Sequence, residues 1–172
     1  MFTTSSFYQA ALPVTSYRTY TFAFLFVAGN LVLPQLTHFI PSGGLIFLPI
    51  YFFTLIAAYK FGITVGLFTA VLSPVVNNLL FGMPPAFVLP AILIKSCLLA
   101  VIAGLVASKS KSISLLHLLA VVLGYQILGS VAEWIITKSL HNALQDFTIG
   151  LPGMLIQVFG GYLLLKKMAT YE

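Results

Sequence analysis

Two charged residues stand inside long apolar stretches of the sequence. Lys95 follows the run Ala-Ile-Leu-Ile, and Glu133 lies within the stretch Gly-Ser-Val-Ala-Glu-Trp-Ile-Ile. A charged side chain inside a bilayer costs about 2.5 kcal/mol or more on insertion scales, and it usually pairs with another charge or marks a functional site. At a rise of 1.5 Å per helical residue, we expect Lys95 about 14 Å and Glu133 about 6 Å below the same membrane surface. The two side chains are therefore expected to pair, either directly or through a ligand.

Uncharged polar side chains recur at helical spacing in the same apolar stretches. Gln126, Ser130 and Glu133, for example, fall on one face of a helix, because residues three and four apart are neighbours there. We expect such stripes to form a polar pocket that opens to the outer side of the membrane. The candidate substrate-binding residues are Asn30, His38, Asn77, Asn78, Lys95, Gln126, Ser130, Glu133, Trp134 and Gln157.

A purely structural interpretation of the same residues stays open. Asn, Ser, Thr and Gln in membrane helices often form hydrogen bonds between helices, each contributing about 0.6 to 2 kcal/mol. Lys95 and Glu133 would then be a structural ion pair, and Trp134 would be an anchor at the membrane interface.

The sequence lacks the motifs of common enzymes. It contains no G-x-S-x-G, no H-E-x-x-H and no Walker A sequence, and it has three acidic residues in all. His38, His117 and His141 are spread over three locations, which disfavours a histidine metal site. We expect no enzymatic activity, no metal and no cofactor, so active transport would draw its energy from another protein.

The composition indicates where these residues lie. Of 172 residues, 60% are hydrophobic and 6% are charged, whereas soluble domains carry roughly 25% charged residues. The composition excludes a soluble domain and indicates a single domain embedded in a lipid bilayer. The net charge of +5 comes from scattered residues that form no basic run, which gives no indication of nucleic-acid binding.

Apolar runs of span length predict an all-α integral membrane protein with six transmembrane helices. The predicted spans are 19–40, 43–59, 62–81, 86–107, 113–137 and 147–165, separated by short turns. With this arrangement, six of the basic residues fall on one side and Lys138 falls on the other. The six are Arg18, Lys60, Lys109, Lys111, Lys166 and Lys167. The positive-inside rule then places both termini in the cytoplasm.

A stripe of small residues in the third predicted span favours close helix packing. Gly62, Gly66 and Ala70 are spaced four apart, and such a face lets two helix backbones approach closely. We expect it to pack within the chain or against a partner protein.

Three stretches resemble the substrate-binding S component of an energy-coupling factor (ECF) transporter. They are His38 to Ile50, the Lys60-Phe61-Gly62 turn with its G-x-x-x-G, and Leu72 to Pro85. The resemblance implies capture of a vitamin or related micronutrient from outside, in a pocket built from the first outer loop and helices 4 to 6. It also implies a transmembrane coupling protein and two ABC ATPases as partners, with toppling of the S component to release the substrate inside.

One feature departs from the pattern of S components that share a common energising module. Those proteins resemble one another in an A-x-x-x-A pattern on helix 1, whereas Ala23 and Ala28 are five apart here. The nearest substitute is Thr19-x-x-x-Ala23, and we expect these two residues to contact the partner or a neighbouring helix.

We therefore predict a multi-pass protein of the bacterial cytoplasmic (inner) membrane that captures a small water-soluble micronutrient. The expected ligand has an anionic or carbonyl group facing Lys95, Asn77 and Asn78, and an amine or hydroxyl facing Glu133. Three alternatives remain. One is a self-sufficient oligomeric facilitator or channel with the Gly62/Gly66 face as its interface, another is a membrane assembly subunit without a ligand, and the third is an intramembrane enzyme.

Overall fold

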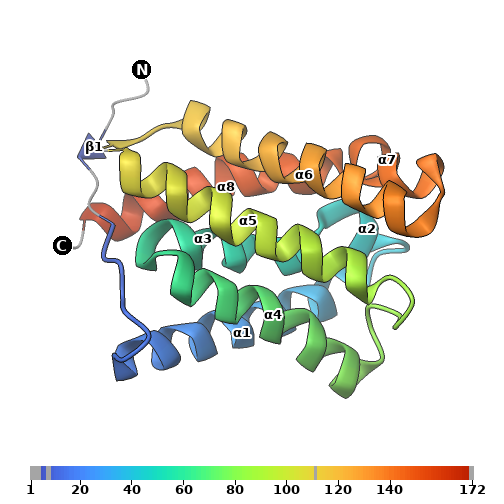
Figure 1. Ribbon diagram of the computed structural model, residues 1–172, viewed down its shortest axis with the longest axis horizontal. Coiled ribbons are helices and arrows are strands. Elements are labelled where there is room, and N and C mark those ends of the chain that lie inside the picture. The colour runs from blue at the N-terminus through green and yellow to red at the C-terminus, as the bar shows by residue number, and fades with distance from the viewer. Residues whose placement is uncertain (1–4, 7–8, 111, 171–172) are drawn as a thin grey trace.

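The computed structural model describes residues 5–6, 9–110 and 112–170, which form an all-helical bundle apart from one two-residue strand pair (Figure 1). Five helices are long: α1 (Tyr17–Thr37), α4 (Ile63–Phe81), α5 (Leu89–Lys109), α6 (Leu115–Thr137) and α8 (Leu151–Thr170). The shorter helices are α2 (Gly43–Phe47), the 3₁₀ turn η1 (Pro49–Tyr51), α3 (Phe52–Phe61) and α7 (Leu140–Thr148). Strands β1 (Ser5–Ser6) and β2 (Ser112–Ile113) pair antiparallel.

Four of the helices are long and apolar enough to cross a membrane. They are α1, α4, α5 and α6. The bent pair α7 and α8, with an angle of 48° between them, passes the same test together, which gives up to five candidate spans among the described residues. Large apolar side chains such as Phe24 and Leu79 are 76% exposed, as expected for surfaces in contact with lipid. These helices suggest a multi-pass membrane protein.

The prediction of one continuous span over 43–59 is wrong. The segment breaks at Leu48, which has a left-handed backbone conformation (φ 47°) between α2 and η1. The break continues at Pro49, which has no backbone N–H to donate to a helix. Helix α3 has only ten residues, so it is about 15 Å long against a hydrocarbon core of about 30 Å.

Helix α3 lies at the centre of the bundle. It contacts α1, α4, α5 and α8, and each residue from Thr54 to Phe61 is buried. This arrangement explains the mostly apolar sequence of the segment, because a helix enclosed by its neighbours has no continuous polar face. The charged residue of α3, Lys60, lies in its last turn and is 1% exposed.

The prediction of a turn over 140–146 is wrong, whereas the span predicted over 147–165 is present with later bounds, as α8 in the bent pair α7 and α8. Residues 140–148 form α7, whose Ser139 N-cap hydroxyl accepts a hydrogen bond from the backbone N–H of Asn142. Leu140 and Leu144 are exposed while Ala143 and Asp146 are buried. The helix is amphipathic, and the chain bends before α8 begins at Leu151. The other predicted spans match α1, α4, α5 and α6 to within three residues at each end.

The stripe of small residues packs within the chain. A side chain at Gly66 would overlap Ala58 of α3 and approach Ala100 of α5, and Ala70 is fully buried. Gly62 has a φ of +90° at the turn between α3 and α4, a conformation that other residues rarely adopt. This internal packing leaves the Gly62/Gly66 face covered, and it removes the interface that the oligomeric channel alternative required.

Thr19 and Ala23, which were predicted to contact a partner or a helix, are also engaged within the chain. The Thr19 hydroxyl donates a 2.7 Å hydrogen bond to the carbonyl oxygen of Pro13. Ala23 is 3% exposed and belongs to the apolar core.

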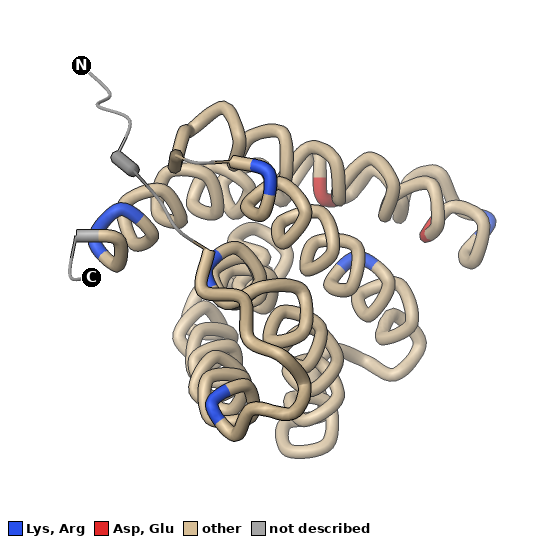
Figure 2. The backbone as a smooth tube through the Cα atoms, turned by 60° about the vertical axis from the view of Figure 1, so that its left-hand side comes forward, with Lys and Arg blue, Asp and Glu red and all other residues tan. Residues whose placement is uncertain are grey.

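The two ends of the bundle differ in their charges. Both termini lie at one end, here called the terminal end, and α2 and α7 lie at the other, here called the α7 end (Figure 1). The described basic residues lie mostly toward the terminal end (Figure 2), at the start of α1 and at the ends of α3, α5 and α8. Lys138 lies at the α7 end, and Lys111 is outside the described residues. The placement of the terminal end in the cytoplasm stays a prediction.

Candidate ligand-binding site

Lys95 forms ion pairs with two carboxylates. Its Nζ atom lies 2.5 Å from Glu133 Oε2 and 2.7 Å from Asp146 Oδ2. The Lys95 side chain is 4% exposed, and those of Glu133 and Asp146 are 13% and 12% exposed. The three residues, here called the ion triad, come from α5, α6 and α7. The direct pairing of Lys95 with Glu133 that the sequence suggested is present.

Helix α6 makes room for the lysine through a glycine. A Cβ atom at Gly129 would lie 2.5 Å from Lys95 Cγ, which is too close for any real side chain. The absence of a side chain lets the alkyl part of Lys95 lie against the α6 backbone and directs the ammonium group toward Glu133, one turn further along. The triad therefore depends on close packing of α5 against α6.

Asp146 was not among the predicted site residues. It belongs to the segment that was interpreted as a turn, whereas it is a buried residue of α7. The available signal was composition: Asp146 is one of only three acidic residues in the chain. An acidic residue in such a chain needs a partner, and Lys95 was the one buried cation that the sequence offered at this end.

On α5, α6 and α8, several buried polar atoms have no hydrogen-bond partner within the described part of the chain. Both amide atoms of Gln126, the Ser130 hydroxyl and the Nε2 atom of Gln157 belong to this group, together with the Ser96 hydroxyl. Gln126 is fully buried and Ser130 is 6% exposed. Buried polar atoms in native structures nearly always have a protein or water partner, so these atoms leave hydrogen-bonding capacity unused.

Two tyrosines border the same region. The rings of Tyr51 and Tyr125 lie 5.5 Å apart at 50°, and the Tyr125 hydroxyl donates a 2.9 Å hydrogen bond to Gln157 Oε1. Both tyrosines are buried, and they connect η1 and α6 to α8.

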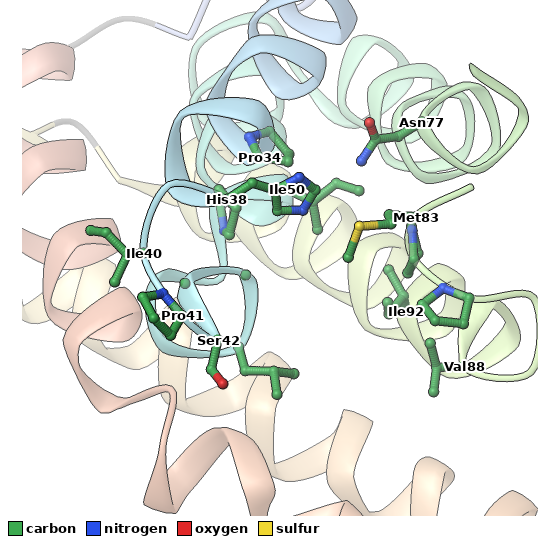
Figure 3. Close-up of a pocket in the computed structure, with 16 residues that line it drawn as sticks. Pro34, His38, Ile40, Pro41, Ser42, Ile50, Asn77, Met83, Val88 and Ile92 are labelled. Carbon is green, nitrogen blue, oxygen red and sulfur yellow. The ribbon is translucent and has the colours of Figure 1, made fainter. Parts of the chain in front are cut away.

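A pocket of about 370 Å³ opens at the same end of the bundle. Figure 3 shows two walls of this pocket that face each other. One wall is formed by the loop before α2 and the first residues of α2, and the other by the α4–α5 connection and the start of α5. His38 and Asn77, two predicted site residues, line it together with Ser42, and most of the other lining residues are apolar. A volume above about 300 Å³ suits a small organic ligand.

The pocket and the ion triad are connected through α5. Ile92 lines the pocket, and Lys95 follows it by three residues, about one helical turn, while Lys95, Glu133 and Asp146 are not among the residues that line the pocket. Gln157 lines another pocket, of about 350 Å³, between α1, α2 and α8. The α7 end thus combines hollow space with buried polar groups.

Three predicted site residues lie elsewhere or are already occupied. The Asn30 amide donates to Thr54 (3.0 Å) and Ser73 (3.1 Å) and accepts from the backbone N–H of Phe53. Asn78 donates a 2.7 Å hydrogen bond to the Pro84 carbonyl oxygen and fixes the following loop. Trp134 is 50% exposed on the outside of α6. Of these, Asn30 and Asn78 have structural roles, and Trp134 does not face the triad.

The acidic residues of the triad are also possible metal ligands by type. Among the described residues, no group of three or more His, Cys, Asp and Glu side chains is placed to hold a metal ion. A lysine held between two carboxylates can orient a ligand through charge and hydrogen bonds.

Comparison of the chain with protein-family models, with curated proteins and with solved structures gave no significant match.

Proposed function

We propose that this protein captures a small water-soluble molecule at its α7 end, as the S component of an ECF-type importer does. The observation that carries this proposal is the combination of a 370 Å³ pocket with unpaired, buried polar atoms on α5, α6 and α8. A subunit that only supported assembly would gain nothing from unpaired buried amides, which cost stability.

The position of the pocket supports the same proposal. It lies beneath the loop that follows α1 and beside the loop that follows α4, at the end opposite most of the described basic residues. On the predicted topology this end faces outward, so a ligand would enter from outside the cell. Release to the cytoplasm then requires a motion driven by partners, and an ECF transmembrane coupling protein with two ABC ATPases would supply it.

The proposal is tested by purifying the tagged protein from its native host in mild detergent. Mass spectrometry of the eluate identifies both the co-purifying proteins and the small molecules. We expect a retained small molecule in the wild-type protein, together with a pair of ATPases and a second membrane protein. Recovery of the protein alone, with no small molecule, would contradict the proposal.

Two variants on α6 provide a matched comparison. Gln126→Leu removes an unpaired buried amide and should lose the small molecule. Trp134→Phe changes an exposed side chain of the same helix and should retain it. Equal retention by both variants would show that the α6 stripe is not the binding surface.

A further inference from the structure

The ion triad contains an unequal number of positive and negative groups. Two carboxylates, Glu133 and Asp146, share the one ammonium group of Lys95. With all three groups ionised, the triad carries one net negative charge. A buried charge without a compensating partner is strongly unfavourable, and this chain places two of its three acidic residues at this one point.

The accessible side of the triad is formed by the carboxylates. Lys95 is 4% exposed, and the two carboxylate side chains are about three times more exposed. One oxygen of each carboxylate, Glu133 Oε2 and Asp146 Oδ2, contacts Lys95, which leaves the other oxygen of each to accept from an incoming group. A ligand that approaches the triad therefore meets acceptors before it meets the ammonium group.

Buried polar atoms without partners lie on the same face of α6 as Glu133. Ser130 and Gln126 precede Glu133 by three and seven residues, so they lie on one stripe that is about 10 Å long. Neither side chain has a hydrogen-bond partner within the described structure. This second observation is independent of the charges, and it points to a ligand that spans from the triad along α6.

We propose that the ligand of this site is an organic cation, whose charged group binds between the free oxygens of Glu133 and Asp146 while Gln126 and Ser130 bind the rest of the molecule. This inference rests on the proposed capture function and specifies the substrate class. It replaces the sequence-based expectation of an anionic group facing Lys95, because that ammonium group is already occupied by two carboxylates.

The test measures the thermal unfolding midpoint of the purified, ligand-free protein with three pools of small molecules. The cationic pool contains choline, putrescine, benzylammonium and thiamine. The neutral pool contains myo-inositol, nicotinamide, pyridoxine and riboflavin, and the anionic pool contains nicotinate, pantothenate, biotin and benzoate. All pools contain the same sodium chloride concentration, so the inorganic cation is constant.

We expect only the cationic pool to raise the unfolding midpoint, by about 5 °C when a component is present at 100 times its dissociation constant. A rise with the neutral or anionic pool alone would overturn the inference and leave the capture function standing. No rise with any pool would count against both the capture function and the inference. The two failures are therefore distinguishable.

Variants of the triad separate ligand binding from structural support. Asp146→Asn leaves Lys95 with one carboxylate and an amide oxygen, so the ligand-free midpoint should stay near that of the wild type while the cation-dependent rise is lost. Glu133→Gln, on α6, should likewise keep the ligand-free midpoint and lose the cation-dependent rise. Asn142→Asp, on an exposed position of α7, is the control and should keep the rise. A retained rise in both triad variants would overturn the inference.

Discussion

The terminal end of the bundle and the middle of α6 both contain glutamine side chains inside the protein, but the two side chains are used differently. At the terminal end, Gln9 Nε2 donates to the carbonyl oxygens of Ala58, Tyr59 and Gly104 at 3.2, 3.3 and 3.2 Å. Halfway along α6, both amide atoms of Gln126 lack a partner within the described residues. The Gln9 amide therefore joins the segment before α1 to α3 and α5, whereas the Gln126 amide retains unused hydrogen-bonding capacity.

Lys95→Met is the change with the largest expected effect on stability. It leaves two carboxylates close together in a buried site, which should lower the free energy of unfolding by about 3 to 5 kcal/mol. Denaturant unfolding of the protein in detergent measures this loss. Lys138→Met, at the exposed cation of the same end, is the control and should change stability by less than about 0.5 kcal/mol. Equal effects of the two variants would show that the triad does not stabilise the fold.

Gly129→Ala is expected to have the next largest effect. The added methyl group would meet Lys95 Cγ at 2.5 Å, and overpacking of this kind costs about 1 to 3 kcal/mol. Gly124→Ala is the matched control on α6, because its methyl group would meet only Ile102, at an ordinary contact distance of 3.7 Å. Thermal unfolding of both variants checks the prediction, and an equally stable Gly129→Ala would contradict the packing described for Lys95.

Gln9→Leu should lower the free energy of unfolding by about 1 kcal/mol, since it removes hydrogen bonds to backbone carbonyl oxygens at the terminal end. Binding of the ligand at the α7 end should be unchanged. Denaturant unfolding and the ligand-dependent midpoint shift measure the two quantities separately. A loss of ligand binding would show that the two ends are coupled.

Gln126→Leu is the counterpart in the middle of α6 and has the smallest expected effect on stability. Removing an unpaired buried amide should leave the ligand-free protein unchanged or more stable by up to about 1 kcal/mol, while ligand binding is lost. The same two measurements apply. A clear destabilisation of the ligand-free protein would mean that Gln126 is paired in the resting state, and the contrast with Gln9 would disappear.

The long helices and the Lys95–Glu133 pair were predictable because their signals are local. Apolar runs of span length mark α1, α4, α5 and α6, and a charge inside such a run needs a partner. By contrast, no residue type in the sequence signals the left-handed backbone at Leu48. An apolar run alone does not show where one helix ends and the next begins. For this reason the prediction of one continuous span over 43–59 was wrong.

The site itself was only partly predictable. Asp146 was missed because its segment is too short and polar to be identified as a membrane helix, and its buried position depends on how α7 packs against α6 and α8. Asn30 was included because it lies on a polar stripe, yet its partners Thr54 and Ser73 come from other helices. Whether a polar side chain already has hydrogen-bond partners depends on its neighbours in space. The spacing of polar residues along one helix does not define those neighbours.

The enclosed position of α3 has a consequence for how the protein is made. A ten-residue helix buried on every side does not gain its environment from lipid, as an ordinary span does, but from α1, α4, α5 and α8. Of these, α8 is synthesised last. Helix α3 therefore reaches its final surroundings only after α8 has docked.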